Sequence, residues 1–359
     1  MPLNFLLLLA IREKRLNVLY FSQTYSTILN TNNKIMKGLL KIMKIKKKKL
    51  IIGIVAAVLA VLLIGGSIAL YAVSVSIYDG SFSYRCDTSD EKRFELSEFP
   101  SMSRERHTFK SNDGQTLVGY LYEYSDTAEK KGVVVFAHGL GAGGQCGYMD
   151  IFDYFCLRGY YVFAYDATAN DESEGEVIGG LPQGTIDLDY AINYAKTIDE
   201  IKELPFVLMG YSWGGMSVVN VLNYQTDVEA VASLAGWNKS MNMIEYRGCE
   251  MVGGVAKLLI PFASLYEYTK YGNYAFSTAM KGFENTDCPV MIVHGEEDDI
   301  IPIEYSYDTY YKKYREDDRF IFKKYENRDH EVMTTESGKL DLALMDEVAD
   351  FFDASIASK

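Results

Sequence analysis

An uncharged apolar run divides the chain into two unequal parts. The segment Leu50–Val73, LIIGIVAAVLAVLLIGGSIALYAV, contains 24 residues and no charged side chain. A helix rises about 1.5 Å per residue, so this segment can cross a hydrocarbon core of roughly 30 Å with some tilt. Because nothing polar interrupts the run, a buried helix of a soluble domain is a poor alternative. We therefore expect one N-terminal transmembrane helix at residues 50–73.

Lysines on one flank of this segment indicate its orientation. The stretch KIMKIKKKK immediately precedes Leu50, and no comparable cluster follows Val73. Positive charge marks the cytoplasmic side, so the chain after Val73 is expected to face away from the cytoplasm. A cleaved signal peptide is the alternative, in which case the domain would be secreted. Its apolar core usually has about 7–15 residues, and the best cleavage pattern here is Ser67-x-Ala69.

The first 49 residues form an N-terminal segment that differs sharply in charge from the rest. They hold 11 basic residues and one acid, whereas the remainder holds 25 basic and 48 acidic residues. An acidic globule argues against a nucleic-acid partner, which requires a basic face. The stretch MKGLLKIMKIKKKKLIIG is typical of a membrane-targeting start. We therefore expect translation to begin at Met36 or Met43, with residues 1–35 disordered or not made.

The residues after the span begin with a linker and then change to a regular alternation of elements. Residues 74–103 are expected to be the linker, and two apolar-alternating runs around Asn112-Asp113-Gly114 then indicate a hairpin. Continuous apolar runs typical of strands buried on both faces follow, separated by helical patterns. These runs are GVVVFAHG, YYVFAYD, PFVLMGY, VEAVASLAGW, PVMIVHG and RFIFKKY. The order predicts an α/β fold with a mostly parallel central sheet and helices on both faces.

One stretch breaks this alternation. Residues 237–285 are rich in methionine and aromatic side chains and fall between two expected sheet strands. The plain interpretation is a set of helices that packs over the sheet. The interpretation that we favour is a small helical cap that covers the site and lines an acyl pocket.

The loop in GVVVFAHGLGAGG has two incompatible interpretations. Gly139, Gly141 and Gly144 satisfy G-x-G-x-x-G after a strand, and Asp166 stands about where a dinucleotide-binding fold keeps its ribose-binding acid. The same letters spell H-G-x-G, a loop that carries a backbone donor for an oxyanion in some hydrolases. The nucleotide interpretation predicts little further along the chain, whereas the hydrolase interpretation makes three further demands.

The chain meets all three demands in order. Gly210, Ser212 and Gly214 form G-x-S-x-G between an expected strand and an expected helix, as a nucleophile on a tight turn requires. The run VMIVHGEEDDIIP then provides an acid at the end of a later strand, with Glu296, Glu297, Asp298 and Asp299 as candidates. His330 follows the final strand in KKYENRDHE, and the chain has only 4 histidines. The hydrolase interpretation therefore prevails, and it requires no nucleotide.

From about residue 104 to the C-terminus the chain resembles the α/β-hydrolase fold superfamily. The motifs that carry the resemblance are HGLG, GYSWGG, HGEEDDIIP and DHE. The nearest groups are bacterial serine hydrolases of the esterase, monoacylglycerol-lipase and serine-aminopeptidase-like kinds. In that superfamily the acid is the fifth residue of H-G-x-x-D-x-x-V-P, which falls on Asp298 here, with Ile301 in the place of the valine. The resemblance implies a hydrolase domain at residues 104–359.

The roles of the residues follow from this chemistry. Ser212 would be the nucleophile, His330 the general base and then acid, and Asp298 the group that orients the imidazole. The backbone N–H groups of Leu140 and Trp213 would form the oxyanion hole. No Cys-x-x-Cys pair or Cys/His cluster indicates a metal site, and no cofactor is expected.

The expected activity is that of a membrane-anchored, extracytoplasmic serine hydrolase. Its substrate would be a small-molecule carboxylic ester or other acyl compound, cleaved through an acyl-enzyme. A peptidase or amidase would use the same triad, and a catalytically inactive binding protein could keep the fold. The intact serine, aspartate and histidine argue against the last alternative.

Overall fold

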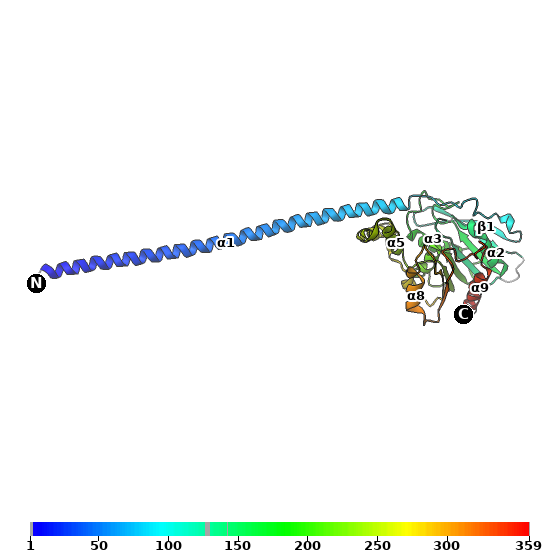
Figure 1. Cartoon of the computed structure of the whole chain (residues 1–359). Coiled ribbons are helices and arrows are strands. Elements are labelled where there is room, and N and C mark those ends of the chain that lie inside the picture. The colour runs from blue at the N-terminus through cyan, green and yellow to red at the C-terminus, as the bar shows by residue number, and fades with distance from the viewer. Residues whose placement is uncertain (1–2, 126–129, 142, 359) are drawn as a thin grey trace. The chain divides into compact units, whose positions relative to one another are not determined.

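The computed structural model describes residues 3–125, 130–141 and 143–358. Its contacts divide the chain into two compact units, Met1–Ala69 and Leu70–Lys359. The first unit is helical throughout its described part. The second contains the sheet, the remaining helices and the predicted catalytic residues (Figure 1).

A single helix, α1, runs over Leu3–Ser81 and includes the predicted span. Within the described residues, the part of α1 over Ser26–Ser81 is long and apolar enough to cross a membrane, by length and composition. Residues 3–35, which we expected to be disordered or not made, belong to this helix. Its last turns, from Leu70 onward, belong to the second unit.

The second unit is built on one eight-stranded sheet with the order β1-β2-β4-β3-β5-β6-β7-β8. β1 and β2 form an antiparallel hairpin, β2 also pairs antiparallel with β4, and all other pairs are parallel. The predicted fold class, an α/β-hydrolase fold with a mostly parallel sheet, is confirmed. The strands are β1 (Ser103–Lys110), β2 (Thr116–Glu123), β3 (Gly132–Ala137), β4 (Tyr160–Tyr165), β5 (Phe206–Tyr211), β6 (Ala230–Leu234), β7 (Val290–Gly295) and β8 (Phe320–Tyr325).

Helices cover both faces of the sheet because the central strands are apolar on both faces. In β3, Val133 and Val135 point into one buried cluster, and Val134 and Phe136 point into the other. The first cluster is closed by α3 (Pro182–Ala195), α4 (Trp213–Asn220) and α8 (Tyr307–Tyr314), and the second by α2 (Met149–Leu157) and α9 (Leu342–Ala357). Full burial on both sides explains why these strands read as continuous apolar runs.

The stretch between β6 and β7 is helical. The turns α5 to η5 form the part that we call the cap, while the next helix, α7, buries Ala279 and Phe283 in the main core. The elements of this stretch are α5 (Ser240–Val252), η4 (Gly253–Leu258), α6 (Ile260–Tyr271), η5 (Gly272–Phe276) and α7 (Ala279–Asn285). The other short helices are η1 (Leu96–Glu98), η2 (Gln145–Tyr148), η3 (Val221–Asn223) and η6 (Ile303–Tyr305).

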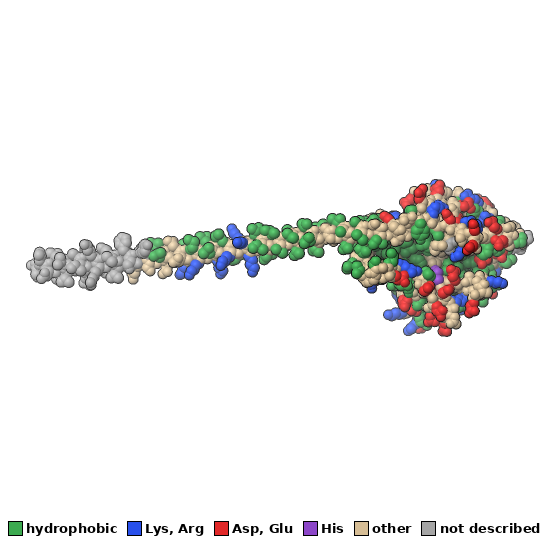
Figure 2. Space-filling view, turned by 45° about the horizontal axis from the view of Figure 1, so that its top comes forward, with side chains coloured by type: hydrophobic (Ala, Val, Ile, Leu, Met, Phe, Trp, Pro, Cys, Tyr) green, Lys and Arg blue, Asp and Glu red, His purple; other side chains and the backbone are tan. Residues whose placement is uncertain are grey.

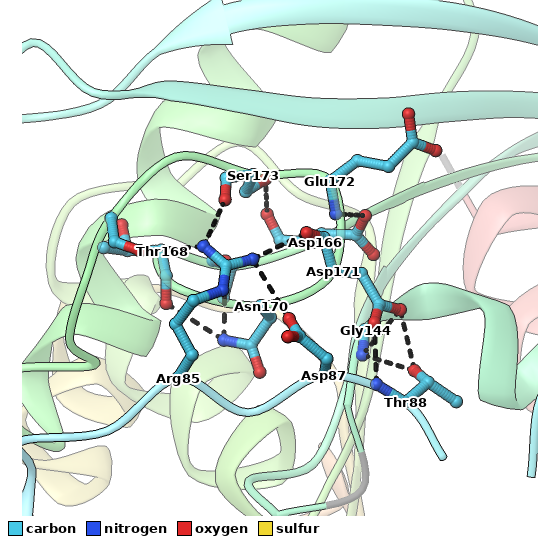
Figure 3. A network of polar contacts seen from close by, with 12 residues as sticks. Arg85, Asp87, Thr88, Gly144, Asp166, Thr168, Asn170, Asp171, Glu172 and Ser173 are labelled. Carbon is cyan, nitrogen blue, oxygen red and sulfur yellow. Dashed lines mark hydrogen bonds and ion pairs between the residues drawn. The ribbon is translucent and has the colours of Figure 1, made fainter. Parts of the chain in front are cut away.

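The segment expected to be a linker, residues 74–103, lies within the second unit and binds to it through polar contacts (Figure 3). The guanidinium of Arg85 donates to the backbone oxygens of Asp171, Ser173 and Gly175 at 2.6, 3.1 and 2.8 Å. The carboxylate of Asp171 in turn accepts from the N–H and the hydroxyl of Thr88, both at 2.7 Å. These bonds fix the chain that leaves α1 to the loop after β4.

Candidate active site

Ser212 lies on the sharp turn that joins β5 to α4. Its backbone has φ 55° and ψ −114°, a region that non-glycine residues rarely occupy. A Cβ added at Gly214 would overlap the carbonyl oxygen of Ala137, and one added at Gly210 would overlap the carbonyl oxygen of Gly214. The turn is therefore possible only with glycine on both sides of the serine, and it presents the hydroxyl above the carboxyl end of the sheet.

The structure brings Ser212, His330 and Asp298 together from three separate loops. Nε2 of His330 lies 2.9 Å from Oγ of Ser212, and Nδ1 of His330 lies 2.8 Å from Oδ2 of Asp298. An ionised carboxylate can only accept, so Nδ1 carries a proton and Nε2 is left to accept from the serine hydroxyl. This is the arrangement that a general base requires.

Four donors surround the carboxylate of Asp298. Oδ1 accepts from the N–H groups of Ile300 and Ile301 at 2.9 and 2.8 Å, and Oδ2 accepts from His330 and lies 3.2 Å from Nε2 of His294. Burial raises the pKa of Asp298, but the hydrogen bonds from the two histidines and the backbone outweigh it. The pKa of this carboxyl therefore lies well below its usual range, and Asp298 is ionised at neutral pH.

His294 is a residue whose part in the site the sequence interpretation missed. Its ring is fully buried, and Nε2 donates to the carbonyl oxygen of Ile301 at 2.9 Å as well as facing Asp298. The available signal was its place as the histidine of H-G-x-x-D, four residues before the acid.

Of the acids that rivalled Asp298, Glu296 pairs with Lys324 at 2.8 Å, and Glu297 and Asp299 are exposed.

His138 is buried and braces the loop after β3. Its Nδ1 donates to the carbonyl oxygen of Gly139 at 2.9 Å, and its Nε2 accepts from the N–H of Ala167 at 3.0 Å. Burial lowers the pKa of His138, which keeps its imidazole neutral.

The two predicted oxyanion donors, Leu140 and Trp213, lie near Ser212. A Cβ at Gly139 would stand 3.5 Å from Cβ of Ser212, so the loop that carries Leu140 lies against Ser212. Trp213 is the first residue of α4, and the N–H groups of a first helical turn have no partner within the helix. The placement of Leu140 and Trp213 is thus compatible with the oxyanion role that we predicted for them.

Asp166, which the nucleotide interpretation would assign to a ribose, is fully buried and serves the loop itself. Its Oδ1 accepts from the N–H of Gln145 at 2.8 Å, and a Cβ at Gly144 would overlap the same oxygen. Burial raises the pKa of Asp166 to about 7. Gly144 is therefore required by the packing of this carboxyl against the loop.

Comparison with known proteins points to the same fold. The sequence matches the family described as serine aminopeptidase, S33, over residues 128–270. An esterase of Pyrococcus furiosus has a similar structure, with a TM-score of 0.59 and 13% identity over 76% of this chain and 99% of its own. An acylaminoacyl peptidase of Pyrococcus horikoshii has a TM-score of 0.55 and 18% identity, over 72% of this chain and 42% of its own. Among curated proteins, none matches the chain.

The family match covers less than half of the chain, and its range contains Ser212 with both flanking glycines. The chain is a serine hydrolase of the α/β-hydrolase fold. In this hydrolase the matched range also contains the loop with Leu140, whereas Asp298 and His330 lie beyond it. The two solved structures, an esterase and an acylaminoacyl peptidase, show the same fold.

A largely apolar cavity of about 440 Å³ opens beside Ser212. Its volume lies within the range of roughly 300–1,000 Å³ that is usual for small-molecule sites. Its wall is formed by residues from the end of α1 and the chain just after it, from the cap, and from the loops that follow β3, β4, β5, β6 and β7. They are Ser74, Ile77, Tyr78, Ser81, Phe82, Tyr84, Leu140, Leu181, Ser212, Trp237, Met243, Ile244, Arg247, Gly248, Met251, Val252, Ala256, Leu259, Ile260, Ala263, Ile300 and Ile301.

Proposed function

We propose that this hydrolase cleaves carboxylic esters through an acyl-enzyme formed on Ser212. The observation that carries the proposal is the chain of hydrogen bonds from Ser212 through His330 to Asp298, at the edge of an apolar cavity. Oγ of Ser212 attacks the acyl carbon while Nε2 of His330 takes its proton. The N–H groups of Leu140 and Trp213 stabilise the oxyanion, each donor contributing about 3–4 kcal/mol to the barrier reduction.

The rest of the cycle uses the same groups. The imidazolium of His330 gives its proton to the departing alcohol as the carbon–oxygen bond of the ester breaks. A water molecule then attacks the acyl-enzyme, its proton passes to Nε2, and the acid leaves with Ser212 restored. Asp298 stays ionised throughout and stabilises the imidazolium, which its depressed pKa supports.

The predicted membrane anchor is part of the proposal. In the most apolar window of α1, none of the residues is buried. Six lysines in residues 41–49 precede the span, so the positive-inside rule orients the hydrolase domain away from the cytoplasm. We therefore propose a single-pass, extracytoplasmic enzyme. Separation of cells into membrane and soluble fractions, with protease added outside intact cells, tests both points.

The lining of the cavity favours an ester over the substrate of an aminopeptidase. An aminopeptidase has to hold a free ammonium group, which needs a carboxylate partner when it leaves water. Among the described residues that line the cavity, none is acidic, and Arg247 carries the only charge. The family match, whose description names an aminopeptidase, makes the peptidase the second candidate.

The test of the proposal uses a fluorophosphonate probe and two substrate series. The probe should label the wild-type protein and fail to label Ser212→Ala, whereas Ser217→Ala, a buried serine one turn further along α4, should still react. A protein that is not labelled at all would be an inactive binding protein with this fold. p-Nitrophenyl esters should then be hydrolysed at least about 100-fold faster, in kcat/KM, than aminoacyl p-nitroanilides, a scale that unpaired polar groups at a site readily produce.

A further inference from the structure

The second unit of the structure contains the end of the predicted membrane span as well as the active site. Leu70–Val73 are the last residues of the apolar run and belong to this unit. Ser74, the next residue, already lines the cavity beside Ser212, and Ile77, Tyr78 and Ser81 follow it there. At about 1.5 Å per residue, the cavity-lining turns of α1 extend only about 12 Å beyond the span. The cavity wall thus begins where the span ends.

Contacts fasten these turns of α1 to the cap helix α6. The ring of Tyr71, within the span, lies edge-on to the ring of Tyr266 at 6.4 Å, and the hydroxyl of Tyr266 donates to Asp79 at 2.8 Å. The hydroxyl of Tyr78 donates to the buried carboxylate of Glu267 at 2.7 Å. Ser74 donates to the carbonyl oxygen of Leu259 at 3.2 Å. The end of the anchor and the cap therefore form one packed body.

The cap also carries an apolar face that protein does not cover. Met251, Val255 and Leu258 are 76%, 65% and 63% exposed, and Val252 is exposed beside them. In Figure 2 hydrophobic side chains gather over the cap helices, whereas acidic side chains are spread over the rest of the visible face of the domain. We call the four residues Met251, Val252, Val255 and Leu258 the cap face. Two of them, Met251 and Val252, also line the cavity.

A cluster of this kind is unfavourable in water and marks a surface that meets a partner. The neighbouring segment of this same chain identifies the partner. The cap contacts the final turn of the predicted membrane span, so the partner is the bilayer. Within residues 251–258, the stretch that holds the cap face, Lys257 is the one charged residue, and its ammonium pairs with Glu245 at 3.3 Å. A long lysine at the edge of an apolar face extends its charge to the headgroup level, so it does not oppose insertion.

We infer that the cap face dips into the membrane that holds the anchor, and that the cavity receives a single acyl chain directly from the bilayer. This inference rests on the proposed ester hydrolysis for its substrate, a bilayer-resident ester with one long acyl chain. An acyl chain that leaves the lipid between Met251, Val252 and the turns of α1 stays in contact with apolar groups until its ester reaches Ser212. The last turns of the anchor are a wall of the acyl pocket.

The insertion is tested without catalysis, by quenching of tryptophan fluorescence. The chain has two tryptophans, Trp213 and Trp237, and both are buried. The full chain is reconstituted in phosphatidylcholine vesicles with brominated acyl chains, as the Val255→Trp variant and as a Leu157→Trp control. Leu157 is 62% exposed, and it lies on α2, on the other face of the sheet. We expect strong additional quenching for Val255→Trp and none for Leu157→Trp; equal quenching would overturn the insertion whatever the enzyme hydrolyses.

The acyl pathway is tested with paired substrates. The Val255→Asp/Leu258→Asp variant should keep its activity on soluble p-nitrophenyl butyrate and lose about tenfold or more on monooleoylglycerol in vesicles. Ile77→Trp, which narrows the wall formed by α1, should lower the ratio of long-chain to short-chain kcat/KM by about tenfold or more, the scale of a change of pocket size. Unchanged ratios in both variants would overturn the pathway. Absence of ester hydrolysis in the wild type would instead overturn the proposed function and leave the quenching result standing.

Discussion

Nε2 of His294 lies 3.2 Å from Oδ2 of Asp298, the same oxygen that accepts from His330. The buried His294 thus helps to hold the carboxylate in the orientation that the imidazole of His330 needs. Because hydrogen bonds to charged groups contribute about 1.5–3 kcal/mol, His294→Leu should lower kcat/KM by roughly 10- to 100-fold. His294→Gln keeps an N–H donor and should retain most of the activity. Equal losses in the two variants, at equal thermal stability, would show that His294 serves packing alone.

Asp298 has near neighbours that give a matched control. Asp298→Asn removes the acceptor that fixes the proton on Nδ1 of His330, and kcat should fall by roughly 10⁴-fold, as the same change does in other triads. Asp299→Asn alters an exposed carboxylate one residue further on and should leave kcat within about twofold. Steady-state kinetics on p-nitrophenyl butyrate compare them. A large loss of kcat for Asp299→Asn, with little loss for Asp298→Asn, would assign the role of the acid in the triad to Asp299 instead.

The turn that holds Ser212 depends on Gly214. A side chain there meets the carbonyl oxygen of Ala137, which is backbone and cannot swing away. Gly214→Ala should therefore lower the free energy of unfolding by about 1–3 kcal/mol or more, and displace the serine. Gly254→Ala, where a Cβ meets open space, should be nearly neutral. Urea unfolding in detergent measures both, and equal midpoints would contradict the account of the turn.

Glu267, in the cap, makes stability depend on pH. Burial raises the pKa of its carboxyl to about 7, above its ordinary value of 4.5, so between these two values the folded protein holds a proton that the unfolded chain releases. Its contribution is therefore complete below about pH 4.5 and is lost as pH rises through 7, by up to about 1.4 kcal/mol per pH unit. Glu267→Gln should remove this fall in the free energy of unfolding with rising pH.

The measurement is the difference in unfolding free energy between wild type and Glu267→Gln at pH 5, 6, 7 and 8, since other titrating groups are common to both. Glu316→Gln, at an exposed position, is the control, and its free energy of unfolding should follow the same pH dependence as that of the wild type. Parallel curves for Glu267→Gln as well would contradict the raised pKa.

Much of the fold follows from the sequence because buried parallel strands have a strong local signal. The run that contains β3 is apolar on both faces. Ser212 lies in G-x-S-x-G, a pattern that itself indicates a tight turn with small residues on both sides of the serine. Contacts between distant residues leave no such signal. Tyr78 and Glu267 are 189 residues apart, and Arg85 reaches a loop that begins after β4. For that reason residues 74–103 looked like a linker, although they build part of the cavity.

The residues of the site divide in the same way, into those with a clear sequence signal and those that depend on a contact formed only in the fold. Ser212 and His330 could be proposed from motif order, and Asp298 from the resemblance to a known pattern. The part of His294 depends on a turn that brings residues 294 and 298 face to face, and the sequence marks it only through the spacing of H-G-x-x-D.

The most direct test of the central claim is to trap the acyl group on the protein. Wild-type enzyme is mixed with p-nitrophenyl decanoate, stopped with acid within seconds, and analysed by intact mass and peptide mapping. We expect the mass of one decanoyl group on the peptide that contains Ser212, and no adduct on Ser212→Ala. Hydrolysis that proceeds with the acyl group on another residue, or that persists in Ser212→Ala, would contradict the account.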